Sequence, residues 1–486
     1  MNYKKIIYGL GIAGSMLAIQ SCDKIKDFKN TNVDPNKTTQ PIPSALLTNV
    51  ESNLGANLVF DAGGANTGAG LYGQYFSETQ YTEVSRYGKP NYNYDAYYAG
   101  PIEDLQNIIS YNSDPATAPI AAGFGSNKNQ IAIARILKAQ YVKFLTDVAG
   151  DLPYTKVLQG QSGVVTAPYD AQQVIYTDLI KELKEAVDQF DNGPTVQGDI
   201  IFSGDVSKWK KYANSLRMLT AMNMLKVDAN TAKTEFLGAL NHSAGVMTSN
   251  ADNVVLNYVG GTFPNPFYNY YNITQRFDFA ESKTMTDQLS STSDARINAY
   301  GSSAKGFPYG LTRDNAVAFA NANPDYANIL NVNYRQSASP LTILSAAYIN
   351  LLRAEAAQRG WTSEDKNALY ANGIQASYDQ WGLGSAATFI ASAPIALTGT
   401  ASDLTKIVTQ EWVAAYPRGS EAWNIYRRAG IPALVPAPGQ TAIPRRAPYG
   451  TADYSLNGTN VGAAAAGYTV NGVPDSQYGR IWWDKP

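Results

Sequence analysis

Eight segments of this chain repeat apolar side chains at every third or fourth position. That spacing collects the apolar side chains on one face of an α-helix, and such a face must pack against another element. The sequence therefore predicts a mostly α-helical protein with a sizeable core. The expected helices cover residues 133–148, 175–190, 209–219, 231–240, 344–360, 365–380, 404–415 and 421–428.

The eight expected helices fall into four sequential pairs. Successive helix pairs are typical of helix–turn–helix repeats that stack into a curved array. The second helix is expected to begin with a capping box formed by Asp170 and Gln173. Because the tetratricopeptide consensus is not visible, the pattern predicts paired helices rather than a named repeat.

Three long tracts between the helices lack a regular pattern, at residues 60–128, 245–340 and 431–486. They are rich in Gly, Asn, Tyr, Pro or Ala, and loops of this length on a rigid scaffold usually carry function. No segment divides the chain as a flexible linker would. We therefore expect residues 41–486 to form one large domain whose irregular loops form the ligand-binding face.

The charge balance and the rarity of histidine and cysteine exclude several classes of function. With 38 basic and 40 acidic residues, the chain lacks the basic surface that nucleic acid binding needs. His242 is the only histidine and Cys22 the only cysteine, which rules out a two-histidine metal site and an internal disulfide. A serine hydrolase would need His242, and no Gly-x-Ser-x-Gly motif is present. We therefore expect no catalytic residue, no cofactor and no nucleic-acid partner.

The first 40 residues predict export and attachment to a membrane. A basic start precedes an uncharged stretch at residues 6–19, which is too short to span a bilayer and is typical of a secretory signal. A small residue, Ser21, stands just before Cys22, as in a bacterial lipobox. We therefore expect a signal peptide at 1–21, acyl chains on Cys22, and a polar tether at 22–40. An ordinary secretory signal with an incidental cysteine is the alternative.

The sharpest resemblance to a known family lies near the C-terminus. Residues 406–416 read KIVTQEWVAAY, and residues 419–432 read GSEAWNIYRRAGIP. With residues 443–449, IPRRAPY, they resemble the signature of the SusD/RagB family of nutrient-binding outer-membrane lipoproteins. Glu411 stands where the family usually has Lys, and Ala429 where it usually has Thr. Shorter matches extend the resemblance over the mature chain, at residues 32–36, 150–154 and 348–355.

The resemblance implies a fold, a location and a partner. The fold would contain four tetratricopeptide-like helix pairs, and the protein would sit on the cell surface, anchored by lipid to the outer membrane. Its partner would be a SusC-like TonB-dependent transporter, which it would cap as a hinged lid. In the signature itself we expect Trp412 and Trp423 to pack between helices. We expect Glu421, Arg427 and Arg428 to form ion pairs or cap contacts rather than touch ligand.

Aromatic residues gather in two of the irregular tracts and suit a ligand-binding surface. Tyrosine is the outlier of the composition, with 33 residues against 15 Phe and 7 Trp. Flat rings can stack on the apolar faces of sugars, while hydroxyl, amide and charged groups bond their edges. The cargo could be a glycan or a peptide, because peptides can use the same surface. The candidate contacts are Tyr81, Tyr87, Tyr92, Phe263, Phe267 and Tyr271, with Asn269 and Arg276 beside the second group.

Two other functions stay open from the sequence. A glycoside hydrolase would need two carboxylates across the scissile bond, and no local motif singles out such a pair. A surface adhesin would need no small ligand. A structural calcium near Asp294 is also open, although no EF-hand spacing surrounds that residue. We expect a binding protein rather than an enzyme.

Overall fold

The computed structural model describes residues 40–159, 163 and 166–486. Residues 43–486 form one compact unit. The expected signal peptide, Cys22 and all of the expected tether except residue 40 lie outside the described residues. Within the described ranges, no helix is both long and apolar enough to span a membrane.

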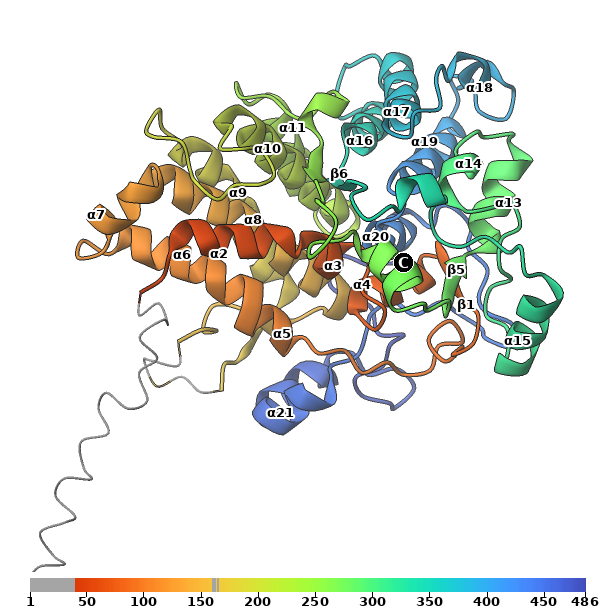
Figure 1. The fold of residues 1–486 in the computed structure, drawn as a ribbon, viewed down its shortest axis with the longest axis horizontal. Coiled ribbons are helices and arrows are strands. Elements are labelled where there is room, and N and C mark those ends of the chain that lie inside the picture. Colours follow the sequence, from red (N-terminus) through yellow and green to blue (C-terminus); the bar gives the residue numbers. More distant parts are fainter. Residues whose placement is uncertain (1–39, 160–162, 164–165) are drawn as a thin grey trace, which may run out of the picture. The chain divides into compact units, whose positions relative to one another are not determined.

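All eight predicted helices are present, and the predicted mostly α-helical fold is confirmed (Figure 1). Apolar stripes in these helices are buried because each one faces another helix. The bounds are α8 Asn127–Ala149, α9 Gln172–Gln189, α10 Val206–Asn223, α11 Ala229–Leu240, α16 Ala346–Gln358, α17 Lys366–Gln380, α19 Asp403–Ala414 and α20 Gly419–Ala429.

Three of the four pairs pack as predicted: α8 on α9, α10 on α11, and α16 on α17. The array continues sideways, because α9 also contacts α10 and α16 also contacts α19. In the last pair, α20 packs chiefly on α4 (Ala65–Tyr72) instead of on α19. Two glycines permit this approach, since a Cβ on Gly419 would lie 2.2 Å from the Cα of Gly70.

The three tracts are not irregular throughout, which corrects the sequence prediction. They contain helices whose sequences carry a weak apolar stripe, such as the Gly- and Ala-rich α4 and α21. Helix α15 is mostly exposed, so it has little apolar periodicity to show. The further α-helices are α2 Pro43–Ser52, α3 Leu54–Leu58, α5 Asp95–Tyr97, α6 Glu103–Ser113, α7 Ala118–Ala121, α12 Pro266–Tyr268, α13 Lys283–Ser291, α14 Ile297–Tyr300, α15 Arg313–Ala322, α18 Ala387–Ala391 and α21 Thr451–Ala466.

The predicted capping box at the start of α9 is wrong. Asp170 belongs to a short strand, and its carboxylate accepts hydrogen bonds from the backbone N–H groups of Tyr154 and Thr155. The first N–H of α9, on Gln172, donates instead to Asp151 at 2.9 Å. The Asp170 carboxylate therefore bonds the backbone that follows the paired strand and does not cap α9.

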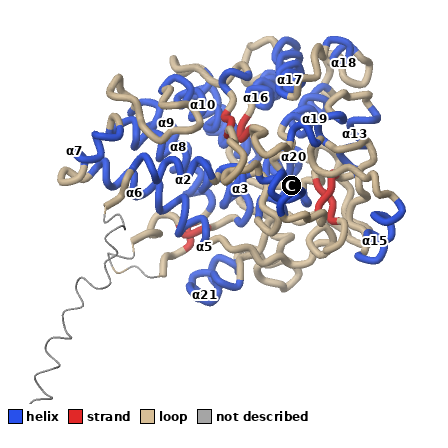
Figure 2. The backbone as a smooth tube through the Cα atoms, viewed as in Figure 1, coloured by secondary structure: helices blue, strands red, loops and turns tan. Residues whose placement is uncertain are grey.

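The described residues contain three two-stranded antiparallel sheets (Figure 2). β2 (Leu152–Pro153) pairs with β3 (Tyr169–Asp170), and β4 (Val254–Leu256) pairs with β6 (Leu341–Leu344). The third sheet joins the first two of the predicted irregular tracts, because β1 pairs with β5 across 200 positions of sequence. Its register opposes Phe76 with Glu281 and Glu78 with Phe279.

Trp412, Trp423 and Arg428 of the C-terminal signature have structural roles, as predicted. Arg427 donates to the Arg445 carbonyl and the Asn424 side chain and forms no ion pair with any described residue, so the ion pair expected for it is wrong. Trp412 and Trp423 are fully buried, and their indole N–H groups donate to backbone carbonyls. The Arg428 guanidinium lies between two buried carboxylates, 2.5 Å from Glu355 and 2.7 Å from Glu411. Glu411, the position that departs from the usual family residue, therefore binds the arginine of the next helix.

Glu355 is bonded by two guanidinium groups, those of Arg428 and Arg359, whereas Glu411 is bonded by that of Arg428. Burial, together with the negative charge of Glu355, raises the pKa of Glu411 well above its ordinary value. Burial acts the same way on Glu355, but the charges of Arg428 and Arg359 outweigh it and hold that pKa at about 2. The cluster ties α16, α19 and α20 together.

Candidate functional site

The β1–β5 sheet brings the two predicted aromatic groups together. Just beyond β1, the backbone N–H of Thr79 donates to the carbonyl of Asp278 at 2.8 Å. The Thr79 hydroxyl donates to the carbonyl of Phe277 at 2.6 Å. Tyr81, which follows β1, is therefore held beside Arg276 and Phe277, which precede β5.

Tyr81 presents an exposed ring with two arginines nearby. Its side chain is 46% exposed, whereas most aromatic residues of these tracts are buried. The Arg276 guanidinium lies 6.0 Å from the ring centroid, and the Arg313 guanidinium of α15 lies 5.5 Å from it. Cation–π contacts of this length restrain the ring, and the Arg276 guanidinium also donates to the Asp278 carboxylate.

A pocket of about 380 Å³ adjoins this ring through Arg276, which lines it. The aromatic side chains of Phe60 and Tyr270 supply apolar surface, while Asp61 and Asn269 supply hydrogen-bonding groups. Burial raises the pKa of Asp61 above its ordinary value. The full lining is Ala56, Phe60, Asp61, Ala62, Pro266, Asn269, Tyr270, Thr274 and Arg276. Apolar surface beside convergent polar groups is the usual composition of a small-ligand site.

Glu78 closes the turn that carries Tyr81. The backbone N–H and the hydroxyl of Ser85 both donate to one Glu78 carboxyl oxygen, at 2.8 Å each. Glu78 is nearly buried, and this burial raises its pKa to about 7. The two bonds join the ends of the 78–85 segment, so the position of Tyr81 is fixed from both sides.

Tyr87 and Tyr92, predicted as ligand contacts, lie in the core. Tyr87 is 5% exposed, and its hydroxyl accepts a hydrogen bond from the backbone N–H of Ala437. Tyr92 is 7% exposed and packs against α4, where a Cβ on Gly68 would lie 1.7 Å from the Tyr92 hydroxyl. Their neighbours cover the rings, so these tyrosines support the loop and leave no stacking face.

The second predicted group is mostly buried as well. Phe267 is fully buried and stacks on Phe60 at 4.5 Å, so it forms part of the floor beneath the pocket. Tyr271 is 4% exposed, and its hydroxyl donates to the carbonyl of Phe279. Phe263 is partly buried against the core. Tyr81 is thus the one predicted aromatic contact that the structure exposes.

Arg313 lies at the site, although nothing in its local sequence predicts a binding role. It lies more than 30 positions beyond both aromatic groups and begins a helix with little apolar periodicity. Arg86 ties the two segments together, since its guanidinium donates to the carbonyl of Gly310 at 3.1 Å. The fold, rather than sequence proximity, therefore supplies this second arginine.

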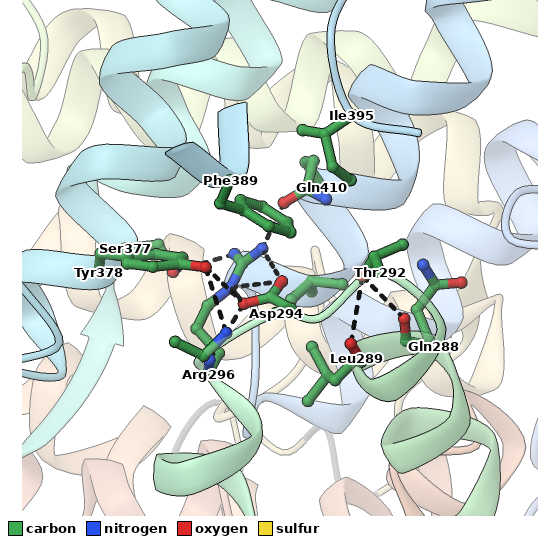
Figure 3. A network of polar contacts seen from close by, with 12 residues as sticks. Gln288, Leu289, Thr292, Asp294, Arg296, Ser377, Tyr378, Phe389, Ile395 and Gln410 are labelled. Carbon is green, nitrogen blue, oxygen red and sulfur yellow. Dashed lines mark hydrogen bonds and ion pairs between the residues drawn. The ribbon is translucent and has the colours of Figure 1, made fainter. Parts of the chain in front are cut away.

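Asp294, the residue considered for calcium, is an ion-pair partner (Figure 3). Its carboxylate is 2.6 Å from the Arg296 guanidinium and accepts a bond from the Tyr378 hydroxyl at 3.0 Å. Both charged groups are buried, and Gln410 and Ser377 bond the remaining arginine nitrogens. In the described residues, no three His, Cys, Asp or Glu side chains are grouped as metal ligands would be.

His242 does not stand beside a nucleophile. Its Nε2 atom lies 3.3 Å from the Asp188 carboxylate on the surface, and its Nδ1 atom accepts from the backbone N–H of Ala244. Both ring nitrogens are therefore occupied by structural contacts.

A family model described as "Starch-binding associating with outer membrane" matches residues 35–450. The chain belongs to the SusD-like family. This confirms the resemblance found in the C-terminal signature and places the chain in a starch-binding family that associates with the outer membrane. No curated protein matches the sequence significantly.

Solved SusD homologues share the fold over most of the chain. A chitin-binding protein is 25% identical, with 91% of this chain and 100% of that chain covered and a TM-score of 0.75. A chitin-binding SusD homologue from Flavobacterium johnsoniae is 24% identical, with 91% and 98% covered and a TM-score of 0.76. A SusD homologue from Bacteroides uniformis ATCC 8492 is 23% identical, with 91% and 99% covered and a TM-score of 0.75.

Proposed function

We propose that this protein captures an oligosaccharide at the surface around Tyr81 and passes it to a SusC-like TonB-dependent transporter. The observation that carries the proposal is the exposed Tyr81 ring beside a pocket with both aromatic and polar walls. A sugar could stack one face on the ring and bond its hydroxyls to Asp61 and Asn269. The starch-binding description of the family and the chitin-binding relatives favour a glycan over a peptide.

The rest of the proposal concerns attachment and partner. Acyl chains on Cys22 would anchor the protein to the outer membrane, and residues 22–40 would tether it. The compact unit would then act as a lid over the transporter and would perform no chemistry on its cargo. The family's association with the outer membrane supports this arrangement.

The test is calorimetric titration of the purified protein with oligosaccharides from starch and chitin and with acidic glycans. We expect at least one of them to bind, and Tyr81→Ala to weaken that binding by about five-fold or more, because stacking contacts of this kind contribute on the order of 1 kcal/mol. Tyr454→Ala is the matched control, since Tyr454 is also exposed but lies on α21.

Three other results would count against the proposal. An unchanged affinity in Tyr81→Ala would place the glycan elsewhere on the protein. Release of new reducing ends during the titration would favour the hydrolase. Failure of every saccharide to bind would favour the adhesin.

A further inference from the structure

The two arginines beside Tyr81 differ in how their charge is balanced. Arg276 forms an ion pair with Asp278, whose side chain is only 12% exposed, so its charge is locally neutralised. Arg313 is exposed and forms no ion pair with any residue that the structure describes. The Arg313 guanidinium makes a cation–π contact with the Tyr81 ring, and this contact does not cancel its positive charge.

Acidic residues near Arg313 in space or sequence do not supply that partner. Asp314 is adjacent in the chain and exposed, but it forms no ion pair with Arg313. Glu83, on the loop that carries Tyr81, is exposed and likewise forms none. An exposed guanidinium therefore remains available at the edge of the proposed stacking face.

The position of Arg313 is set by the fold. The bond from Arg86 to the carbonyl of Gly310 ties the segment before α15 to the Tyr81 loop. The Arg313 guanidinium then lies 5.5 Å from the ring on which a sugar would stack. A substituent projecting from that sugar would come within reach of the guanidinium, which can bond carboxylate or sulfate oxygens in pairs.

We propose that the natural cargo is an acidic oligosaccharide, whose carboxylate or sulfate group binds Arg313 while its ring stacks on Tyr81. This inference rests on the proposed function, because it assumes a glycan at that surface. Neutral hydroxyls would bond the pocket side chains Asp61 and Asn269. The site would then select for a negative charge at one end and for hydroxyls at the other.

The test uses pairs of ligands that differ only in charge. One pair is an oligogalacturonate and its fully methyl-esterified form, and the other is a carrageenan oligosaccharide and its desulfated form. Neutral starch and chitin oligosaccharides complete the panel. Affinities are measured by calorimetry for the wild type, Arg313→Gln and Arg313→Lys, at low and high salt, with Lys184→Gln as a control that removes an exposed charge on α9.

We expect one acidic ligand to bind roughly ten-fold or more tightly than its neutralised form, because a charge-assisted bond is lost with the charge. That preference should shrink at high salt, be lost in Arg313→Gln, be partly kept in Arg313→Lys, and be kept in Lys184→Gln. A preference within the galacturonate pair would indicate a carboxylate ligand, and a preference within the carrageenan pair would indicate a sulfate ligand.

The outcomes separate the two proposals. If a neutral saccharide binds as tightly as every acidic one, or if Arg313→Gln leaves the preference intact, the acidic cargo is wrong and the glycan-binding function stands. If no saccharide of either kind binds, the glycan-binding function itself is wrong.

Discussion

At the scale of single residues, Glu281 is a buried acid whose ionised form would be destabilised by the loss of water around it. It lies in β5 next to the candidate site, fully buried, and neither carboxyl oxygen has a hydrogen-bond partner among the described residues. Burial alone raises its pKa well above the ordinary value of 4.5. The folded protein therefore keeps this acid protonated at a pH at which the unfolded chain ionises it.

The sign of the pH dependence follows from that raised pKa. Stability linked to Glu281 is fully present below pH 4.5 and is lost as the pH rises toward the folded pKa. We expect the wild type to lose roughly 1.4 kcal/mol of unfolding free energy for each pH unit in that window, relative to Glu281→Gln. Denaturant unfolding of both proteins from pH 5 to pH 9 measures the difference.

Glu103→Gln serves as the control, because Glu103 is exposed on α6 and should show a much smaller change. Parallel stability curves for the wild type and Glu281→Gln would contradict the prediction. They would mean that an ordered water or ion satisfies this carboxyl group.

The sequence predicted which residues have structural roles more accurately than it predicted which residues are exposed to a ligand. Trp412, Trp423 and Arg428 belong to a motif whose spacing already indicates packed helix faces, and all three are buried as expected. A tyrosine in an irregular tract carries no such signal, because its ring suits the core and the surface equally. Tyr81 and Tyr87 are six positions apart in one loop, and only tertiary packing decides which of them is exposed.

At the scale of elements, the β1–β5 sheet positions the site. Thr79 couples the loop that carries Tyr81 to Phe277 through its hydroxyl. We expect Thr79→Val, which keeps the shape and removes this bond, to weaken glycan binding several-fold while lowering the unfolding free energy by only about 1 kcal/mol. Calorimetry and thermal unfolding of the same samples separate the two effects.

Thr177→Val removes a similar hydroxyl-to-carbonyl bond from an exposed turn of α9 and should leave the affinity unchanged. Equal loss of affinity in both variants would show that the effect is not specific to the sheet. An unchanged affinity in Thr79→Val would mean that the two loops hold their positions without this bond.

Helices with an apolar stripe were predictable, and helices without one were not. The stripes of α8 and α9 follow directly from side-chain spacing, because one face of each must be buried. In α4, glycine and alanine allow close contact with α20 but leave no stripe to read. Short strands such as β1 and β5 depend on a partner 200 positions away, so neither could be recognised from its own sequence.

At the scale of the whole molecule, strand β1 of the site contacts α4, and α4 packs on α20. The β1–β5 sheet joins the two aromatic tracts. The site's residues come from segments near positions 60, 80, 270 and 313, so no local motif could have defined it. A rigid scaffold that carries an exposed binding surface is what a lid that delivers cargo would need.

The most direct test of this account is to isolate the tagged protein from native outer membranes in mild detergent and to identify everything that remains bound. The account predicts a TonB-dependent transporter in roughly equal amount and a saccharide in the wild-type complex, with the saccharide reduced in Tyr81→Ala while the transporter is retained. Recovery of the protein alone, from membranes in which other complexes survive, would contradict the lid.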